Sequence, residues 1–383
     1  MNILQITSHL DVGGIPRYVL SLSEQLAHRG HQVTLASDGG QLEARVQERG
    51  LTHWRLPLHT SAEFSLRVFS AYRHVVERLR RQPVDLLHAH TRVAQVIAHA
   101  VSRRLGIPYV TTWHGIYKPR LGRRLWPCMG HRTIAISGQV AEHLRSAFHL
   151  PEARARLVYN GINTGHYARR PAAATVQAWR KRWHLPEGQP VIGGIGRCAT
   201  GRVKGFDLIL VAAYALKARF PGLQVLLVGD GPRRPFLEDV AKRLGLYRCV
   251  HFVGAVDDVR IPLALLDVFI FPSRWPEAFG LTLVEAMAAG KAVVATSHGA
   301  VTEILQHDVQ GWIVPPNDSL ALADSIQGLL HDRAVAARLG QAAQARARGA
   351  FDVSRMVTEI EAVYREVVSS ADGTGRSSED DWA

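Results

Sequence analysis

Short apolar segments alternate with longer segments of helical periodicity along most of this chain of 383 residues. The apolar segments, which predict strands, span residues 3–9, 31–37, 51–56, 84–90, 109–115 and 132–137, and then 190–198, 223–231, 249–254, 268–271 and 311–316. Helices are expected between them, among others at residues 63–81, 93–104, 138–147, 204–220 and 319–331. Repeated β–α units with apolar strands predict parallel sheets covered by helices on both faces.

Two such series predict two α/β domains, and the chain is long enough for two domains of ordinary size. We place the first domain at residues 1–165 and the second at residues 166–354, with a linker near residues 160–170. Helical periodicity continues to residue 368. The polar tail at residues 369–383 is expected to be disordered.

Residues 272–296 read PSRWPEAFGLTLVEAMAAGKAVVAT and directly follow a predicted buried strand. A helix is expected to begin near Phe279, with Glu277 in the preceding loop and Glu285 on the second turn. Free backbone amides and the positive end of the dipole make the start of such a helix a seat for a diphosphate. The amides are those of Phe279, Gly280, Leu281 and Thr282. The two carboxylates can then accept hydrogen bonds from sugar and ribose hydroxyls.

This segment resembles the E-x7-E signature of retaining glycosyltransferases of family 4. Two Glu eight positions apart are common, but the surrounding string makes the match specific. The resemblance covers the chain to about residue 368 and implies the GT-B fold, an α/β architecture with two Rossmann-like parallel-sheet domains facing a central cleft. It implies that the first domain binds the acceptor, that the second binds the nucleotide sugar, and that a helix at residues 355–368 crosses back to the first domain. A solvated helix with two surface glutamates is the alternative.

Gly13 and Gly14 lie between the first predicted strand and its helix, where α/β units often bind phosphate. The pattern is not GxGxxG, and no acidic residue about 20 positions further on is placed to bind a ribose, which disfavours a dinucleotide dehydrogenase. The resemblance implies that the two glycines form a tight turn facing the donor diphosphate. An ordinary βα turn is the alternative.

Arg197 follows a predicted strand and Lys204 opens the next helix, with Gly201 and Gly205 nearby. Two cations at this place can clamp a diphosphate and stabilise the charge that builds on it as a sugar leaves. The pair matches the GR…KG pair of the family, and such a clamp needs no metal and no cofactor beyond the nucleotide-sugar co-substrate. A surface salt bridge is the alternative.

His114 ends a predicted strand in TTWHG, and the resemblance implies that it touches the transferred sugar and, with Glu277, Arg197 and Lys204, is catalytic. His88 and His90 end the neighbouring predicted strand, and for them contact with the acceptor and core packing are equally open. The resemblance also implies that Val256, in the loop FVGAVDD, receives the nucleobase. Gly229 is expected to allow close approach to the donor.

The net charge of +13 is unevenly distributed. Residues 1–165 hold 21 Lys/Arg against 10 Asp/Glu, a net +11, whereas the remainder holds 25 against 23, a net +2. A local focus at residues 117–132 carries no acid, and it includes Lys118, Arg120, Arg123, Arg124 and Trp126. Cations with interfacial aromatics are typical of an anionic membrane surface, and an anionic acceptor also fits; a solvated basic surface is the alternative. Nucleic acid is not expected, because no recognised binding motif is present.

Three scattered cysteines, no apolar run near about 20 residues and no basic segment ahead of an apolar core lead us to expect a cytoplasmic protein, able to attach to the inner face of the membrane. The expected function is a retaining transfer of sugar from a nucleotide diphosphate, UDP before GDP. The acceptor is expected to be a lipid-linked saccharide, a lipopolysaccharide or another cell-envelope glycan. A non-catalytic binder of sugar nucleotide or nucleic acid, and a GT-B epimerase or phosphorylase, are the alternatives.

Overall fold

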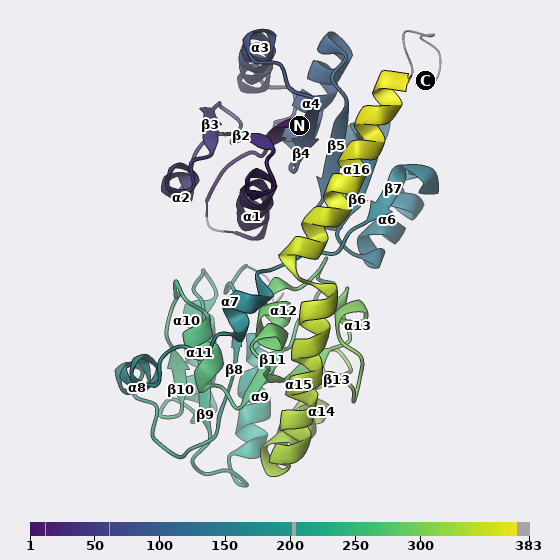
Figure 1. Cartoon of the computed structure of the whole chain (residues 1–383). Coiled ribbons are helices and arrows are strands. Elements are labelled where there is room, and N and C mark those ends of the chain that lie inside the picture. Colours follow the sequence, from purple (N-terminus) through teal and green to yellow (C-terminus); the bar gives the residue numbers. More distant parts are fainter. Residues whose placement is uncertain (12, 61, 201–203, 374–383) are drawn as a thin grey trace. The chain divides into compact units, whose positions relative to one another are not determined.

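The computed structural model describes residues 1–11, 13–60, 62–200 and 204–373, which form two compact units (Figure 1). The first unit joins Met1–Gly161 with the helix α16 (Val353–Gly373), and the second is Ile162–Asp352. Each unit is built on a parallel sheet, which confirms the predicted α/β class with two parallel-sheet domains.

In the described residues the first sheet has seven strands in the order β3-β2-β1-β4-β5-β6-β7. These strands are β1 (Asn2–Ile6), β2 (Gln32–Ser37), β3 (Thr52–Arg55), β4 (Leu86–Ala89), β5 (Tyr109–Trp113), β6 (Arg132–Ala135) and β7 (Ala155–Leu157). The helices of this unit, besides α16, are α1 (Gly14–His28), α2 (Glu43–Glu48), α3 (Leu66–Arg81), α4 (Arg92–Leu105), α5 (Leu121–Leu125) and α6 (Gly138–Phe148).

Successive side chains along the strands of the first sheet point to opposite faces and pack into two separate hydrophobic cores. Ile3 of β1 packs with α1 and α16 on one face, whereas Leu4 and Ile6 pack with α3 and α4 on the other. The period of two places Gln5 on the face of Ile3, beneath α16. Gln5 pairs in register with His88 of β4, so a polar stripe runs across an otherwise apolar sheet face.

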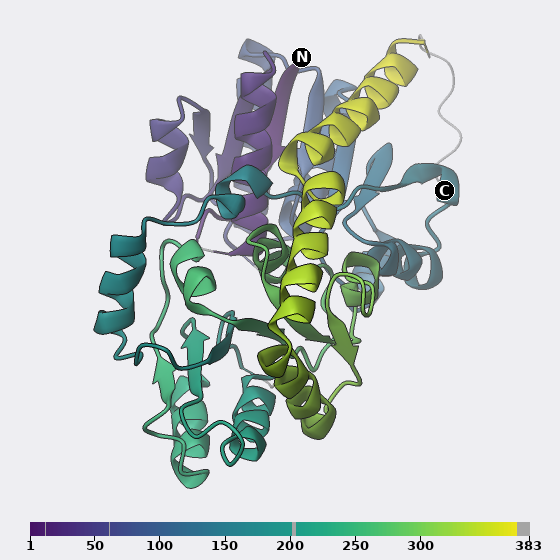
Figure 2. The same ribbon diagram turned by 60° about the horizontal axis from the view of Figure 1, so that its bottom comes forward.

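Helix α16 (yellow in Figures 1 and 2) lies along the first sheet. Val357, Ile360 and Tyr364 are fully buried in this contact, and Glu361 accepts hydrogen bonds from Arg29 and His31. The helix continues to Gly373 rather than to residue 368, which shortens the predicted disordered tail. Residues 374–383 of that tail lie outside the described residues.

The second sheet, over the same described part of the chain, has six strands in the order β10-β9-β8-β11-β12-β13. They are β8 (Val191–Ile195), β9 (Gln224–Val228), β10 (Val250–Phe252), β11 (Val268–Phe271), β12 (Ala292–Thr296) and β13 (Trp312–Val314). The helices are α7 (Thr164–Ala168), α8 (Ala173–Arg182), α9 (Phe206–Leu216), α10 (Arg234–Arg243), α11 (Arg260–Leu265), α12 (Leu281–Ala288), α13 (Val301–Ile304), α14 (Ser319–His331) and α15 (Arg333–Ala350).

Three helices begin later than the sequence predicts, each for a local reason. Helix α3 begins after Ser65, whose Oγ accepts the N–H of Val68 and caps the first turn. Helix α9 begins after Gly205 (φ +61°) and α12 after Gly280 (φ +119°). Because these glycines adopt a left-handed backbone, Lys204 and Phe279 lie in loops rather than in the predicted helices.

Candidate functional site

The strand order of the second sheet reverses between β8 and β11, because β8 continues to β9 and β11 continues to β12. The carboxyl ends of parallel strands leave a crevice for a ligand at such a point. The segment after β8 carries Arg197 and Lys204, and the segment after β11 carries Glu277. The sheet topology therefore brings these three predicted residues to one edge.

Lys204 and Glu277 form an ion pair at this edge, with Lys204 Nζ 2.6 Å from Glu277 Oε1. Ser273 Oγ lies 3.2 Å from the same oxygen, and the ammonium is 5.7 Å from the centre of the Phe271 ring. The side chains of the pair are 27% and 15% exposed, so solvent and ligand both have access to it.

Two glycines allow the backbone segments behind this pair to approach closely. A Cβ added at Gly205 would lie 1.9 Å from the carbonyl oxygen of Pro272, and one added at Gly299 (φ +66°) would lie 2.4 Å from the backbone nitrogen of Glu277. Ala300 N–H also donates to the Glu277 carbonyl at 3.0 Å. The positions of Lys204 and Glu277 are therefore set by backbone contacts that no side chain larger than hydrogen permits.

Arg197 and Gly229 lie next to the same ion pair. The side chain of Lys204 runs beside Gly196, where an added Cβ would lie 3.5 Å from Lys204 Cδ. Gly229 (φ +128°) packs against the Gly196 carbonyl, 2.0 Å from an added Cβ. Arg197 is exposed, and its guanidinium has no ion pair within the described residues. Gly201 lies outside the part of the chain that the structure describes.

The start of α12 offers backbone donors at the carboxyl end of β11. Leu283 N–H bonds back to the Gly280 carbonyl at 3.0 Å. The amides of Leu281 and Thr282 precede the first helical hydrogen bonds and have no backbone acceptor among the described residues. Together with the helix dipole, these amides favour a bound anion.

Two residues predicted to bind the nucleotide-sugar donor have side chains that point into the interior of the second unit. The Phe279 side chain is 3% exposed and packs edge-to-face on Phe351, with ring centres 5.7 Å apart. Glu285 is 6% exposed and accepts a hydrogen bond from Tyr167 at 3.0 Å. Phe279 thus supports the loop through packing, and Tyr167 orients the Glu285 carboxylate from α7.

Val256 lies in the loop after β10 and is half-buried. It lines a hollow together with Trp179 of α8 and Trp183, which directly follows that helix. The Gly229 N–H donates to the Gly254 carbonyl at 2.7 Å, so this loop is tied directly to the turn after β9.

The first sheet has a second reversal, between β1 and β4. Gly13 and Gly14 follow β1, His90 follows β4 and His114 follows β5. His90 Nδ1 lies 3.3 Å from His114 Nε2, so the two predicted histidines are adjacent. Gly13 has an extended backbone (φ 179°) and α1 begins at Gly14, so the predicted tight turn does not need the left-handed freedom of glycine here.

Burial keeps the histidines of this edge uncharged. It lowers the pKa of His114 to about 3, and it lowers the pKa of His88 and His90 well below the usual value, with a smaller effect from neighbouring histidines. His88 is enclosed by the hydroxyls of Tyr364 (2.6 Å) and Thr112 (2.7 Å), which places it in the core.

The predicted basic residues lie on and around α5. Lys118, Arg120 and Arg124 are exposed. Arg123 is half-buried, and its guanidinium lies 4.8 Å from the centre of the Tyr117 ring. Stacking and burial therefore make Arg123 less available to a partner than the three exposed cations.

Large apolar side chains lie exposed in the same region. Each is more than half exposed, and they are Phe64, Leu66, Phe69, Leu121, Leu125 and Trp126. Arg92 joins the two segments that carry them, donating to Glu63 at 2.8 Å and to the Trp126 carbonyl at 2.7 Å. We call residues 64–69 and 118–126 the basic–apolar face. No described helix combines the length and the apolar content that crossing a bilayer requires.

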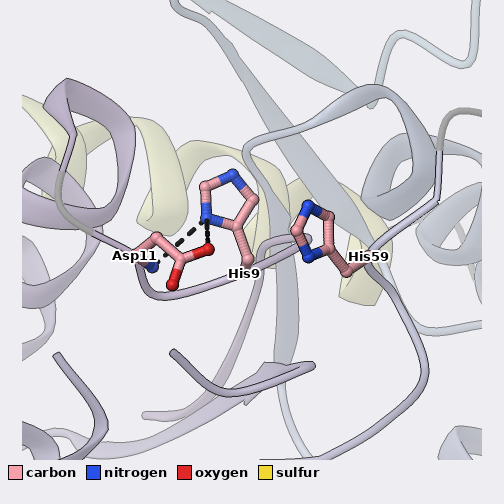
Figure 3. A group of neighbouring side chains, drawn as sticks. All are labelled: His9, Asp11 and His59. Atoms are coloured by element: carbon pink, nitrogen blue, oxygen red, sulfur yellow. Dashed lines mark hydrogen bonds and ion pairs between the residues drawn. The ribbon is translucent and has the colours of Figure 1, made fainter. Parts of the chain in front are cut away.

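His9, Asp11 and His59 form a polar cluster in the loops after β1 and β3 (Figure 3). The Asp11 N–H donates to His9 Nδ1 at 3.2 Å, and the two imidazole rings are 4.9 Å apart. One candidate ligand atom from each residue lies within 4.8 Å of the others. His9 Nδ1 also lies 3.4 Å from Asp11 Oδ2, so the imidazole and the carboxylate interact directly.

Some residues that contact the predicted site residues were not predicted from the sequence. Ser273 contacts Glu277 from within the quoted motif, but a serine in a Pro-rich loop carries no signal of its own. Gly299 and Tyr167 reach Glu277 and Glu285 from distant parts of the chain, and no spacing rule connects them.

Two family descriptions match consecutive parts of the chain. Residues 12–166 match "Glycosyltransferase Family 4", and residues 175–346 match "Glycosyl transferases group 1". The two matches correspond to the two units and together span most of the sequence.

Individual proteins match over nearly the whole chain. An N-acetyl-alpha-D-glucosaminyl L-malate synthase of Bacillus anthracis is 27% identical, covering 95% of this chain and 96% of its own. A phosphatidyl-myo-inositol mannosyltransferase of Mycobacterium leprae is 29% identical, covering 94% of each.

Solved structures agree in fold. A glycosyltransferase of Rickettsia africae superposes with a TM-score of 0.87 at 22% identity, covering 96% of this chain and 98% of its own. Anabaena Alr3699/HepE, solved with UDP and glucose, superposes with a TM-score of 0.81 at 24% identity, covering 95% and 99%. These likenesses identify the fold of this chain as GT-B.

Proposed function

This chain belongs to glycosyltransferase family 4, and we propose that it transfers a sugar from a UDP-sugar to a cell-envelope acceptor with retention of anomeric configuration. The observation that carries the proposal is the Lys204–Glu277 ion pair, held by Gly205 and Gly299 beside the start of α12. UDP is preferred over GDP because the fold relative HepE is described with UDP and with UDP-glucose.

The donor diphosphate would bind at the amides of Leu281 and Thr282 and draw Lys204 away from Glu277. Arg197, which is exposed and adjacent, would supply the second cation. As the bond to the sugar breaks, negative charge grows on the diphosphate, and two cations there stabilise the transition state more than the bound donor. Glu277, released from Lys204, would accept hydrogen bonds from sugar hydroxyls.

We further propose that departure of the diphosphate and attack of the acceptor occur on one face of the sugar. Glu277 Oε1 lies against an ammonium and a hydroxyl, contacts that suit a hydrogen-bond acceptor better than a nucleophile. Because Lys204 and Arg197 would stabilise the negative charge of the departing diphosphate, we propose that the reaction needs no metal. His114, neutral at physiological pH, would contact the transferred sugar.

The acceptor is proposed to be a lipid-linked saccharide, a lipopolysaccharide or a related anionic glycan, bound by the first unit. Exposed cations and exposed apolar side chains share the basic–apolar face, a combination that suits a lipid with an anionic headgroup. Trp126, Lys118, Arg120, Arg123 and Arg124 are the proposed contacts. His90, which the sequence left open as an acceptor contact, is 1% exposed and hydrogen-bonded through both ring nitrogens, so it is not among them. The relative from Mycobacterium leprae is named for a lipid acceptor, phosphatidyl-myo-inositol.

A donor and acceptor screen tests this function. Purified protein is incubated with UDP- and GDP-sugars and with lipid-linked and soluble glycans, and nucleoside diphosphate release is measured with and without acceptor. We expect release that depends on the acceptor, an α-linked product from an α-linked donor, and unchanged rates in EDTA. Inversion of configuration would overturn the proposed retention. Loss of activity in EDTA that magnesium or manganese restores would overturn the proposal that no metal is needed. Binding without turnover of any donor would favour a non-catalytic binder.

A further inference from the structure

A buried chain of hydrogen bonds in the first unit connects α16 to His114. Tyr364 of α16 contacts Gln5 of β1 at 3.1 Å, Gln5 contacts His90 at 2.6 Å, and His90 contacts His114 at 3.3 Å. Tyr364, Gln5 and His90 are each no more than 1% exposed, so water does not compete for these bonds. A buried network of this kind acts as a unit, because each polar atom that loses its partner is costly.

The direction of the bonds on the His114 side follows from the Gln5 amide. Gln5 Oε1 faces His90 and can only accept, so the proton of neutral His90 lies on Nε2. His90 Nδ1 is then an acceptor, and the His114 Nε2–H must donate to it. In the neutral ring, this leaves the lone pair of His114 on Nδ1.

The direction of the bonds on the α16 side holds the amide in that orientation. Gln5 Nε2 donates to the Tyr364 oxygen, so the Tyr364 O–H donates to His88 Nδ1 at 2.6 Å. The His88 proton then lies on Nε2 and is donated to Thr112 Oγ1 at 2.7 Å. Gln5 belongs both to the hydrogen-bond chain on the His114 side and to the chain on the α16 side, and we call these chains the two arms. Reversing the Gln5 amide would therefore require every one of these protons to move.

The ring of His114 has a second contact within the unit. Tyr18 of α1 packs edge-on against it, with ring centres 4.7 Å apart, and Tyr18 shares a hydrogen bond with Thr112. The orientation of the ring is thus supported from one side by Tyr18 and from the other by His90. His114 itself is only half-buried, so part of the residue is accessible.

We propose that Tyr364 and Gln5 are positioning residues that hold His114 in the Nε2–H tautomer, so that its Nδ1 accepts a hydrogen bond from a hydroxyl group of the bound sugar. His114 then selects a donor sugar by its hydroxyl, because a sugar that lacks this group leaves Nδ1 without a partner. This part rests on the proposed function. The tautomer itself is a property of the resting protein and can be measured without substrate.

Ring ¹⁵N chemical shifts of histidine-labelled full-length protein test the network directly, with His114 assigned from its Gln variant. In the wild type we expect Nε2 protonated and Nδ1 unprotonated at pH 7. Tyr364→Phe and Gln5→Met remove the coupling between the arms, and we expect His114 to show both tautomers. Glu366→Gln is the matched control on α16: it weakens the surface contacts with Arg132 and Arg156 and should leave the shifts unchanged.

A protonated Nδ1 in the wild type, or an unchanged Nε2–H tautomer in both Tyr364→Phe and Gln5→Met, would overturn the proposal. Equal shifts in Glu366→Gln and Tyr364→Phe would show that seating of α16, and not the hydrogen bond, controls the ring. Circular dichroism confirms that each variant is folded, and the conservative Tyr364→Phe change keeps the packed ring in place.

Kinetics with deoxy donors then test the consequence for substrate choice. Among singly deoxygenated analogues of the preferred donor, we expect one whose kcat/KM with the wild type is lower than that of the preferred donor. In Tyr364→Phe we expect this decrease in kcat/KM to be about fivefold smaller, because one neutral hydrogen bond contributes a factor of that size. Equal discrimination by both proteins, with the expected shifts, would leave the network intact but remove His114 from sugar recognition. Absence of transfer with every donor would count against the proposed function and not against the tautomer.

Discussion

Among single residues, Lys204 is central to the candidate site, because it forms the ion pair with Glu277. Lys204 reaches Glu277 because Gly205 lets its loop pass within contact of the Pro272 carbonyl. The chemistry and the backbone geometry therefore belong to adjacent residues and can be separated by substitution.

Lys204→Ala should lower turnover at least ~100-fold, as expected for losing a charge that stabilises the transition state. The measurement is nucleoside diphosphate release at saturating donor, with the melting temperature as a check on folding. Lys181→Ala, an exposed lysine of α8, is the control and should retain full turnover. Wild-type turnover in Lys204→Ala would remove this residue from the mechanism.

Gly205→Ala should destabilise the second unit by more than about 3 kcal/mol, because it combines a left-handed backbone with a clash. Gly245→Ala is the matched control: its φ of +65° is close to the +61° of Gly205, but nothing lies within 4 Å of the added Cβ. We expect it to cost about 1–2 kcal/mol. Denaturant unfolding measures both, and equal losses would mean that the loop yields to the methyl group.

The free energy of unfolding should decrease as the pH is lowered below about 6.5, because burial holds the pKa of His88, His90 and His114 low. The unfolded chain takes up protons there and the folded chain does not, so each residue contributes up to about 1.4 kcal/mol per pH unit until its folded pKa is reached. Denaturation between pH 7.5 and pH 5 checks the sign. His90→Gln should reduce the slope, and a slope unchanged by that substitution would contradict this origin.

At the scale of elements, α16 is the part of the first unit that comes from the far end of the chain. Its buried face carries an apolar row that completes the core with α1, and its polar members reach Arg29, His31 and the histidine network. A helix made of residues after 352 thus completes a unit whose sheet ends before residue 162.

Ile360→Ala on α16 should therefore cost about 2–5 kcal/mol of the first unit's stability, because the side chain is fully buried. Glu359→Ala, its neighbour, removes only a surface ion pair with Arg355 and should cost less than about 0.5 kcal/mol. Denaturant unfolding compares the two, and similar small costs would show that α16 adds little to the first unit.

The elements were largely predictable, because strands buried on both faces read as apolar runs. Helix α14 begins and ends where its periodicity predicts, whereas α3, α9 and α12 begin two or three residues later than predicted. Caps and left-handed glycines decide those starts, and their effect depends on backbone conformation rather than on hydrophobic period. The short helices α2, α5, α7, α8, α11 and α13 were not predicted, since short segments carry little periodic signal.

At the scale of the whole molecule, the charge excess belongs to the first half of the sequence, and its focus coincides with exposed apolar side chains. Arg120→Glu with Arg124→Glu should weaken binding to anionic liposomes at least about tenfold, because each cation near such a surface contributes about 1 kcal/mol. Sedimentation with vesicles measures this binding.

The control for the liposome experiment is Lys181→Glu with Lys242→Glu, the same change of charge at exposed positions of the second unit. Leu121→Ser with Leu125→Ser tests the apolar contribution and should also weaken binding. If the two charge-reversal variants bind alike and Leu121→Ser with Leu125→Ser binds like the wild type, net charge alone governs attachment and the basic–apolar face has no special role.

The two α/β domains and the family could be predicted from the amino-acid sequence, and so could the charged residues that we propose for the donor site, because these predictions depend on local apolar period and on one dense motif. Tertiary structure alone decided which residues meet. Gly299 supports Glu277, Tyr167 binds Glu285, and Tyr364 joins Gln5 to the histidines across more than 350 positions. Such contacts arise where strand ends and returning helices come together in space, and no spacing along the chain specifies them.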